Sequence, residues 1–157
     1  MRLLIVDAKN LLSPAILQGL REEGWLMDVV NTFEKGLWIA KTNSYDLAIF
    51  ANESGEESEA KIHNFFRECP QLFLLVILKN FSWENKIRLL EKGADEVLAS
   101  SCTFRELTLK IRILLRREKS RKIDQGMIKI DDLLIDIANF RVKRGKEPIT
   151  LRRKEFD

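Results

Sequence analysis

Five short apolar runs separated by amphipathic segments fill the first 118 residues, and this alternation constrains the fold more than any other feature. The runs lie at residues 3–6, 25–30, 47–50, 72–78 and 96–99. The segments between them carry apolar residues at helical spacing, at residues 11–20, 33–40, 62–67, 83–92 and 103–117. Short apolar strands joined by helices form parallel sheets that are covered on both faces. The sequence therefore predicts an α/β fold built on a five-stranded, doubly wound parallel sheet.

The carboxyl ends of the predicted strands are the places to look for a site, because doubly wound sheets bind their ligands there. Residues 51–59, which follow the third run, are small and acidic and predict a loop. The whole chain has 157 residues, enough for one domain of ordinary size and about 30 to 40 residues more.

Composition excludes several classes of protein. Hydrophobic residues make up 45% and charged residues 32%, which is typical of a globular protein. The longest apolar run, residues 72–78, is too short to cross a membrane, and Asp7 interrupts the first run too early for a secretory signal. We therefore expect a cytoplasmic protein without a membrane partner, in which Cys69 and Cys102 remain structural thiols.

The tail differs from the body in charge and in pattern. Residues 1–118 hold 16 basic and 17 acidic residues, a net charge of −1, whereas residues 119–157 hold 11 and 7, a net charge of +4. Strand-like pieces at 127–130, 133–137, 140–143 and 148–151 predict a small antiparallel β-sheet, and 152–157 resemble the start of a helix. The basic tail favours a polyanionic partner, and a solvated tail is the alternative.

The order and spacing of several motifs match a known family. In the body they are RLLIVD at 2–7, YDL at 45–47, GADE at 93–96 and FREL at 104–107. In the tail they are IDDLLID at 130–136, RGK at 144–146, and Leu151 with KEFD at 154–157. The chain resembles a bacterial response regulator of the OmpR/PhoB type, a transcription regulator of two-component systems. The resemblance implies a flavodoxin-like receiver over residues 1–118, a linker over 119–126, and over 127–157 the N-terminal β-sheet and first helical residues of an incomplete winged-helix DNA-binding domain.

The phosphorylation chemistry of that family looks absent. A receiver takes a phosphoryl group on an aspartate, with acids that hold Mg²⁺, a lysine and a hydroxyl around it. By resemblance these positions fall here on Asp7, Ala8, Ala51, Leu78 and Ser100. Ala51 stands at the acceptor position, and a methyl group takes no phosphoryl group. We therefore expect a degenerate site with no phosphoacceptor, no metal and no cofactor.

The remaining polar groups near this site have ordinary interpretations. Asp7 is expected to accept hydrogen bonds from a neighbouring backbone, and a pair with Lys9 is the alternative. The acids Glu53, Glu56, Glu57 and Glu59 predict a solvated loop rather than a divalent-ion site, and His63 a surface helix residue. No phosphate-binding loop or nucleophile motif is present, so the chain is not expected to be an enzyme.

A dimerisation face is implied by the same resemblance. Its crossed ion pairs fall on Lys86 with Glu106, Glu96 with Lys110, and Asp95 with Arg117. Ile87 and Leu90 supply an apolar centre, while the usual small apolar residue is replaced by Thr108. The phosphate-driven relay falls on Leu78 and Val97, so a homodimer has to form without phosphorylation. Solvated charge on two amphipathic helices is the alternative.

We expect the tail to contact DNA phosphates through Arg152, Arg153 and Lys154. Further basic side chains of the tail are Arg141, Lys143, Arg144 and Lys146. Such contacts give affinity without sequence reading, so specific binding by this chain alone is not expected. The first hypothesis is an atypical, phosphorylation-independent response regulator that dimerises through its receiver. The alternatives are a pseudo-receiver module that binds a protein or small ligand, a remnant without function, and a Mg²⁺-dependent phosphotransfer enzyme.

Overall fold

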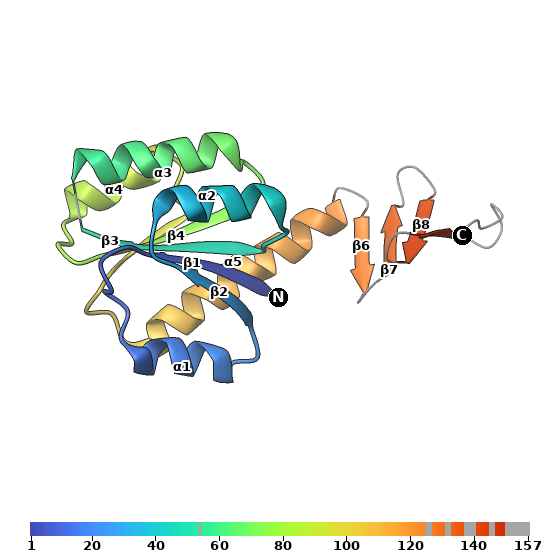
Figure 1. Cartoon of the computed structure of the whole chain (residues 1–157), viewed down its shortest axis with the longest axis horizontal. Helices are drawn as coiled ribbons and strands as arrows, with labels where there is room; N and C mark the ends of the chain where they lie inside the picture. The colour runs from blue at the N-terminus through green and yellow to red at the C-terminus, as the bar shows by residue number, and fades with distance from the viewer. Residues whose placement is uncertain (54, 125–126, 131–132, 137–140, 145–146, 150–157) are drawn as a thin grey trace. The chain divides into compact units, whose positions relative to one another are not determined.

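A computed structural model describes residues 1–53, 55–124, 127–130, 133–136, 141–144 and 147–149 of the chain (Figure 1). Within it the chain divides into two compact units, Met1–Leu115 and Arg116–Asp157.

The first unit is a parallel sheet with helices on both faces. Its strands are β1 (Arg2–Asp7), β2 (Leu26–Val30), β3 (Leu47–Asn52), β4 (Phe73–Leu78) and β5 (Glu96–Ala99), in the order β2-β1-β3-β4-β5. Its helices are α1 (Pro14–Glu22), α2 (Phe33–Thr42), α3 (Glu56–Glu68), α4 (Trp83–Glu91) and α5 (Phe104–Asp124). Helices α1 and α5 cover one face, and α2, α3 and α4 cover the other (Figure 1). The predicted α/β fold with a five-stranded parallel sheet is confirmed.

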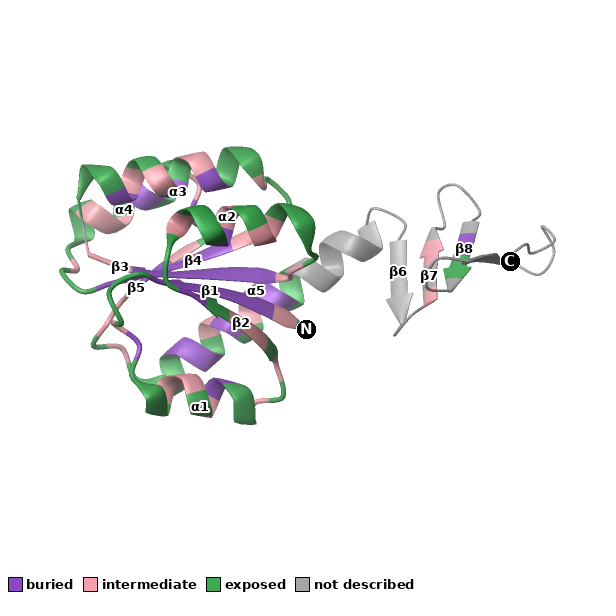
Figure 2. Ribbon diagram, viewed as in Figure 1, coloured by how far each residue is buried: buried purple, intermediate pink, exposed green. Residues whose placement is uncertain are grey.

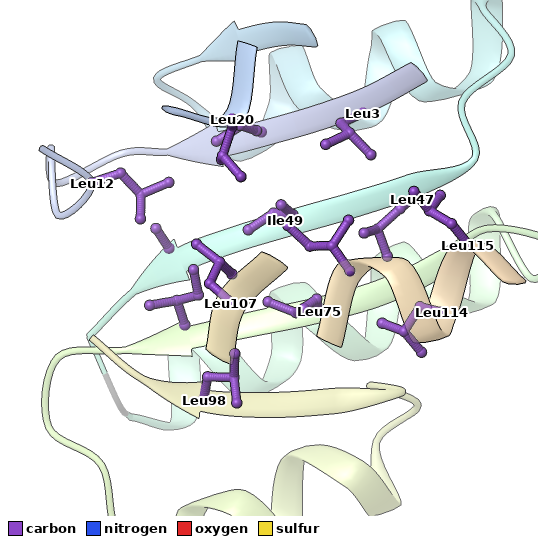
Figure 3. Close-up of a cluster of buried hydrophobic side chains, with 14 residues drawn as sticks. Leu3, Leu12, Leu20, Leu47, Ile49, Leu75, Leu98, Leu107, Leu114 and Leu115 are labelled. Atoms are coloured by element: carbon purple, nitrogen blue, oxygen red, sulfur yellow. The ribbon is translucent and has the colours of Figure 1, made fainter. Parts of the chain in front are cut away.

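Two hydrophobic cores, one on each face of the sheet, hold this unit together. Along β1, Leu3 and Ile5 belong to the core beneath α1 and α5 (Figure 3), whereas Leu4 and Val6 belong to the core on the opposite face. Side chains alternate between the two faces of a strand, so a strand covered on both faces must be apolar throughout. Figure 2 accordingly shows buried strands between helices whose outer surfaces are exposed.

The segment predicted as a loop over residues 51–59 is the clearest error in the first unit. Strand β3 continues to Asn52, and α3 already begins at Glu56. Ala51 is buried, which extends the apolar strand beyond the run visible in the sequence. Glu56, Glu57 and Glu59 occupy the first turn of α3, where carboxylates interact favourably with the positive end of the helix dipole. The acidic residues therefore mark a helix start.

The second difference lies after the predicted end of the last helix at residue 117. Helix α5 continues to Asp124, across most of the segment predicted as a linker over residues 119–126. Residues 118–122 are charged side chains and a serine without glycine or proline, and such residues propagate a helix readily.

The second unit contains a small antiparallel sheet, as its strand-like pieces predict. Its strands are β6 (Met127–Ile130), β7 (Leu133–Asp136), β8 (Arg141–Arg144) and β9 (Glu147–Ile149), paired in that order. The helix start predicted at 152–157, with the phosphate contacts Arg152, Arg153 and Lys154, lies outside the described residues. Lys143 on β8 is exposed. In the part of the chain that the structure describes, no helix has the length and apolar character needed to span a membrane.

Candidate functional site at the strand ends and the α4–β5–α5 face

Buried apolar side chains stand at the carboxyl ends of the central strands, where the family resemblance places the phosphorylation chemistry. Ala51 lies opposite Asp7 on one side and Ile77 on the other. The side chains of Ala51 and Leu78 are 2% and 0% exposed. Ser100 follows β5, and its backbone N–H donates to the carbonyl oxygen of Leu78 at 2.8 Å. A buried methyl group and a buried leucine therefore occupy two of the positions that the resemblance assigns to the phosphorylation site.

Asp7 anchors the loop between β1 and α1. Its side chain is buried, its Oδ1 accepts the N–H of Leu11 at 2.8 Å, and its Oδ2 accepts the N–H of Leu12 at 3.0 Å. Both carboxylate oxygens are thus engaged with the backbone. Among the ion pairs of the described residues, none joins Lys9 to Asp7, so the alternative pairing is not formed.

Three glutamates near this edge of the sheet form ion pairs with lysine or arginine side chains. Glu53 lies 3.4 Å from Lys79, and Glu57 lies 2.6 Å from Lys61. Glu59 lies 3.2 Å from Arg88 on α4. No group of three or more histidines, cysteines, aspartates or glutamates within the described ranges is arranged to hold a metal ion. His63 is exposed on α3, with its Nδ1 3.3 Å from the carbonyl oxygen of Lys92.

Glu96 lies between two lysines of the same chain. Its carboxylate oxygens lie 2.8 Å from the Nζ of Lys86 and 2.6 Å from the Nζ of Lys110. Burial acts to raise the pKa of Glu96, but the hydrogen bonds from Lys110 and Lys86 outweigh it and lower the pKa to about 2. The Glu96–Lys110 pair, expected between two protomers, is therefore already present within one.

The other predicted interface acids have different surroundings. Glu106 is exposed on α5, and its backbone N–H donates to the Thr103 hydroxyl at 3.1 Å. The carboxylate of Asp95 accepts the N–H of Leu74 at 2.8 Å, so part of its hydrogen-bonding capacity is used within the fold. Arg117 is exposed on α5, and Thr108 is buried and donates to the carbonyl oxygen of Arg105. The structure brings together Lys86, Glu96 and Lys110.

Helix α4 presents an apolar stripe to solvent beside this charge cluster. The exposed fractions are 72% for Trp83, 56% for Ile87 and 37% for Leu90. These residues are spaced i, i+4 and i+7, which places them along one face of the helix. Phe81 packs edge-on against Trp83 at 5.7 Å between ring centroids, and the Nζ of Lys86 lies 5.8 Å from the Trp83 ring centroid. Sequence reasoning found Ile87 and Leu90 but missed Trp83, although the same spacing pointed to it.

Glu96 gives the charge cluster a defined pH dependence. The unfolded chain binds a proton on Glu96 near the usual pKa of 4.5, whereas the folded protein does so only near pH 2. The stability from this carboxylate is therefore present above pH 4.5 and lost as the pH falls toward 2. Urea unfolding should show Glu96→Gln less stable than wild type at pH 6, with the difference shrinking below pH 4.5. A difference that stays constant with pH would contradict this assignment.

No protein-family model matches the chain. It is 30% identical over 157 residues to the transcriptional regulatory protein CusR of Escherichia coli K12, covering 99% of this chain and 69% of CusR. It is 31% identical over 159 residues to the transcriptional regulatory protein PcoR of E. coli, covering 99% and 68%.

Solved structures share the fold of the first unit. An orphan response regulator of H. pylori, HP1043, has a TM-score of 0.65 at 24% identity and covers 74% of this chain and 97% of its own. An atypical orphan response regulator, whose regulatory mechanism is described as phosphorylation-independent, has a TM-score of 0.64 at 24% identity and covers 74% and 96%. At these identities the likeness supports the receiver fold.

Proposed function

The chain belongs to the family of OmpR/PhoB-type response regulators, and from that premise we propose that it acts in transcription control without being phosphorylated. The observation that carries this proposal is the buried Ala51 at the phosphoacceptor position, accompanied by Ala8, Leu78 and Ser100 at the positions of the other catalytic groups. The methyl group of Ala51 offers no oxygen for a phosphoryl group. In this proposal the chain is a cytoplasmic regulator without enzymatic activity of its own.

Its active conformation has to be stabilised by the sequence itself. In ordinary receivers a phosphoryl group shifts the balance between two conformations. Moving such a balance from 1:99 to 99:1 takes about 5.5 kcal/mol of differential interaction. Here Leu78 and Val97 replace the hydroxyl and the aromatic residue that respond to the phosphoryl group, and both are fully buried. Buried apolar side chains at both positions support a receiver that keeps one conformation without a phosphoryl group.

The proposed assembly is a homodimer through α4, β5 and α5. Trp83, Ile87 and Leu90 supply an exposed apolar centre, and tryptophan is among the residues that most often carry the binding energy of an interface. Lys86, Glu96 and Lys110 pair with one another beside it, and twofold symmetry would bring the same three groups of a second copy to this face. Glu106, Asp95 and Arg117 are proposed as further charged contacts.

The sheet of β6, β7, β8 and β9 is proposed as the N-terminal sheet of a winged-helix DNA-binding domain, joined to the receiver through the end of α5. The antiparallel order of its strands and the exposed Lys143 support this assignment. Lys143, Arg152, Arg153 and Lys154 would contact phosphates. Phosphate contacts make the affinity for DNA steeply dependent on salt.

The dimer is tested by replacing Ile87 with aspartate. Light scattering behind a sizing column should give a dimer mass for wild type and a monomer mass for Ile87→Asp. The dissociation constant should rise by about tenfold or more, because a charge enters the apolar centre on both protomers. Treating wild type with Mg²⁺ and a small phosphodonor should leave both its mass and its dimer fraction unchanged.

Leu26→Asp is the matched control, because Leu26 is 69% exposed on β2, at the edge of the sheet opposite β5. This variant should dimerise like wild type. A wild-type monomer at high micromolar concentration would refute the dimer, and a phosphodonor-dependent gain of one phosphoryl group would refute phosphorylation independence. The two parts of the proposal therefore fail separately.

A further inference from the structure

A pocket of about 310 Å³ opens at the carboxyl ends of β1 and β3. These two strands are the switch point of the sheet, because β2 lies beyond β1 and β4 lies beyond β3. Open α/β sheets bind ligands in the crevice at this point. Val6, Phe50 and Ala51 line the pocket from the strands, and all three are almost fully buried.

The walls of the pocket come from helices on one face of the sheet. The start of α2 contributes Thr32 and Phe33, and α3 contributes Ser58 and Ile62. Leu78 and Ser100 do not line it, so the pocket extends to the α2 and α3 side of the degenerate phosphorylation site. Ala8 and Ala51 do line it, which places methyl groups where the family carries carboxylates. The inner surface of the pocket therefore lacks the two carboxylates that would repel an anion in an ordinary receiver.

The charged side chains of the lining balance in number, with Lys9 and Lys61 against Glu34 and Glu57. Glu57 and Lys61 neutralise each other at 2.6 Å. Lys9 is exposed at the pocket and forms no ion pair or hydrogen bond within the described residues, although, after the hydrogen bond from Lys61, its charge also helps to lower the pKa of Glu57. Glu34 is the opposing carboxylate in the lining and disfavours a multiply charged anion. Because the lining carries no net charge, it accommodates a single carboxylate held directly by Lys9 better than a phosphate dianion.

The pocket lining also contains neutral hydrogen-bond donors and aromatic rings. The Oδ1 of Asn52 accepts the N–H of Glu53, which leaves its amide NH₂ able to donate. The Thr32 hydroxyl oxygen accepts the N–H of Lys35 and keeps its own O–H for a ligand. Phe33 and Phe50, whose ring centroids lie 6.1 Å apart, give the pocket an apolar side.

We propose that this pocket binds a small aromatic carboxylic acid, with its carboxylate at Lys9 and its ring against Phe33 and Phe50. The pocket volume lies at the lower end of the range for small-molecule sites, which suits a ligand of this size. The inference does not rest on the proposed dimer, because the pocket is lined from β1, β3, α2 and α3. Such a ligand would give this receiver an input other than phosphorylation.

The test follows backbone amide signals of the ¹⁵N-labelled chain during titration with benzoate, and with benzamide as its uncharged isostere. Benzoate should shift the signals of Ala8, Lys9 and Asn52 with a dissociation constant on the order of 1 mM, a normal affinity for so small a ligand. Benzamide should bind about tenfold more weakly, because it lacks the charge-assisted bond to Lys9.

Two variants and one control locate the site. Lys9→Met removes the ammonium group, and Ala8→Phe fills the pocket from an exposed position, so both should weaken benzoate binding by about tenfold or more. Lys35→Met is the control, since Lys35 is an exposed lysine on α2 outside the lining, and it should bind like wild type. Absent shifts at tens of millimolar benzoate, equal affinity for benzamide, or an equal loss in Lys35→Met would each overturn the proposal.

Discussion

Replacing Gly93 with alanine should destabilise the protein by about 2 to 5 kcal/mol, from a disfavoured backbone conformation together with overpacking. Gly93 follows α4 with a φ of +111°, which L side chains rarely adopt. A Cβ atom there would lie 2.3 Å from the Cγ of Phe66, well inside van der Waals contact. The ring of Phe66 lies against the turn that closes α4, so either the ring or the turn has to move.

Gly24→Ala is the matched control for this variant. Gly24 has a φ of +81°, and a Cβ atom there would meet nothing within 4 Å. Its cost is therefore conformational alone, about 1 to 2 kcal/mol. Urea unfolding of both variants, followed by far-UV circular dichroism, separates the two contributions. Equal losses in the two variants would mean that Phe66 moves away freely and that the close approach costs nothing.

Much of the first unit could be predicted from its sequence, because strands buried on both faces are apolar at every position. The run at residues 96–99 coincides with β5. The errors occurred where a high density of charged residues was interpreted as a loop or a linker. Glu56 starts a helix, and residues 118–124 continue one, because charged side chains without glycine or proline suit a helix as well as a linker.

The candidate sites depend more on tertiary contacts, which the sequence does not contain. The family resemblance assigns the phosphorylation positions to the strand ends, which the apolar runs mark in the sequence, and that assignment stays a prediction. The shared pairing of Glu96 with Lys86 and Lys110 could not be predicted, since it joins α4, β5 and α5 across the fold. The pocket was missed for the same reason, because its lining comes from four separate segments and no local pattern marks it.

Replacing Asp7 with alanine should destabilise the protein by about 2 to 4 kcal/mol, because two hydrogen bonds to a charged acceptor are lost. The N–H groups of Leu11 and Leu12 would lose their partner, and Leu12 is itself part of the core beneath α1. Glu53→Ala is the control. Glu53 carries a partly exposed pair with Lys79 at 3.4 Å, worth at most about 1 kcal/mol.

Magnesium separates this anchoring role from a metal-binding role. In a receiver that binds Mg²⁺, the acid after the first strand is a ligand, so the metal would stabilise the folded state. Both oxygens of Asp7 are already bonded to the backbone, and Ala8 supplies no second carboxylate. Millimolar Mg²⁺ should therefore leave the urea midpoint of wild type unchanged. A midpoint that rises with Mg²⁺ in wild type but not in Asp7→Ala would make Asp7 a metal ligand and reopen the phosphotransfer hypothesis.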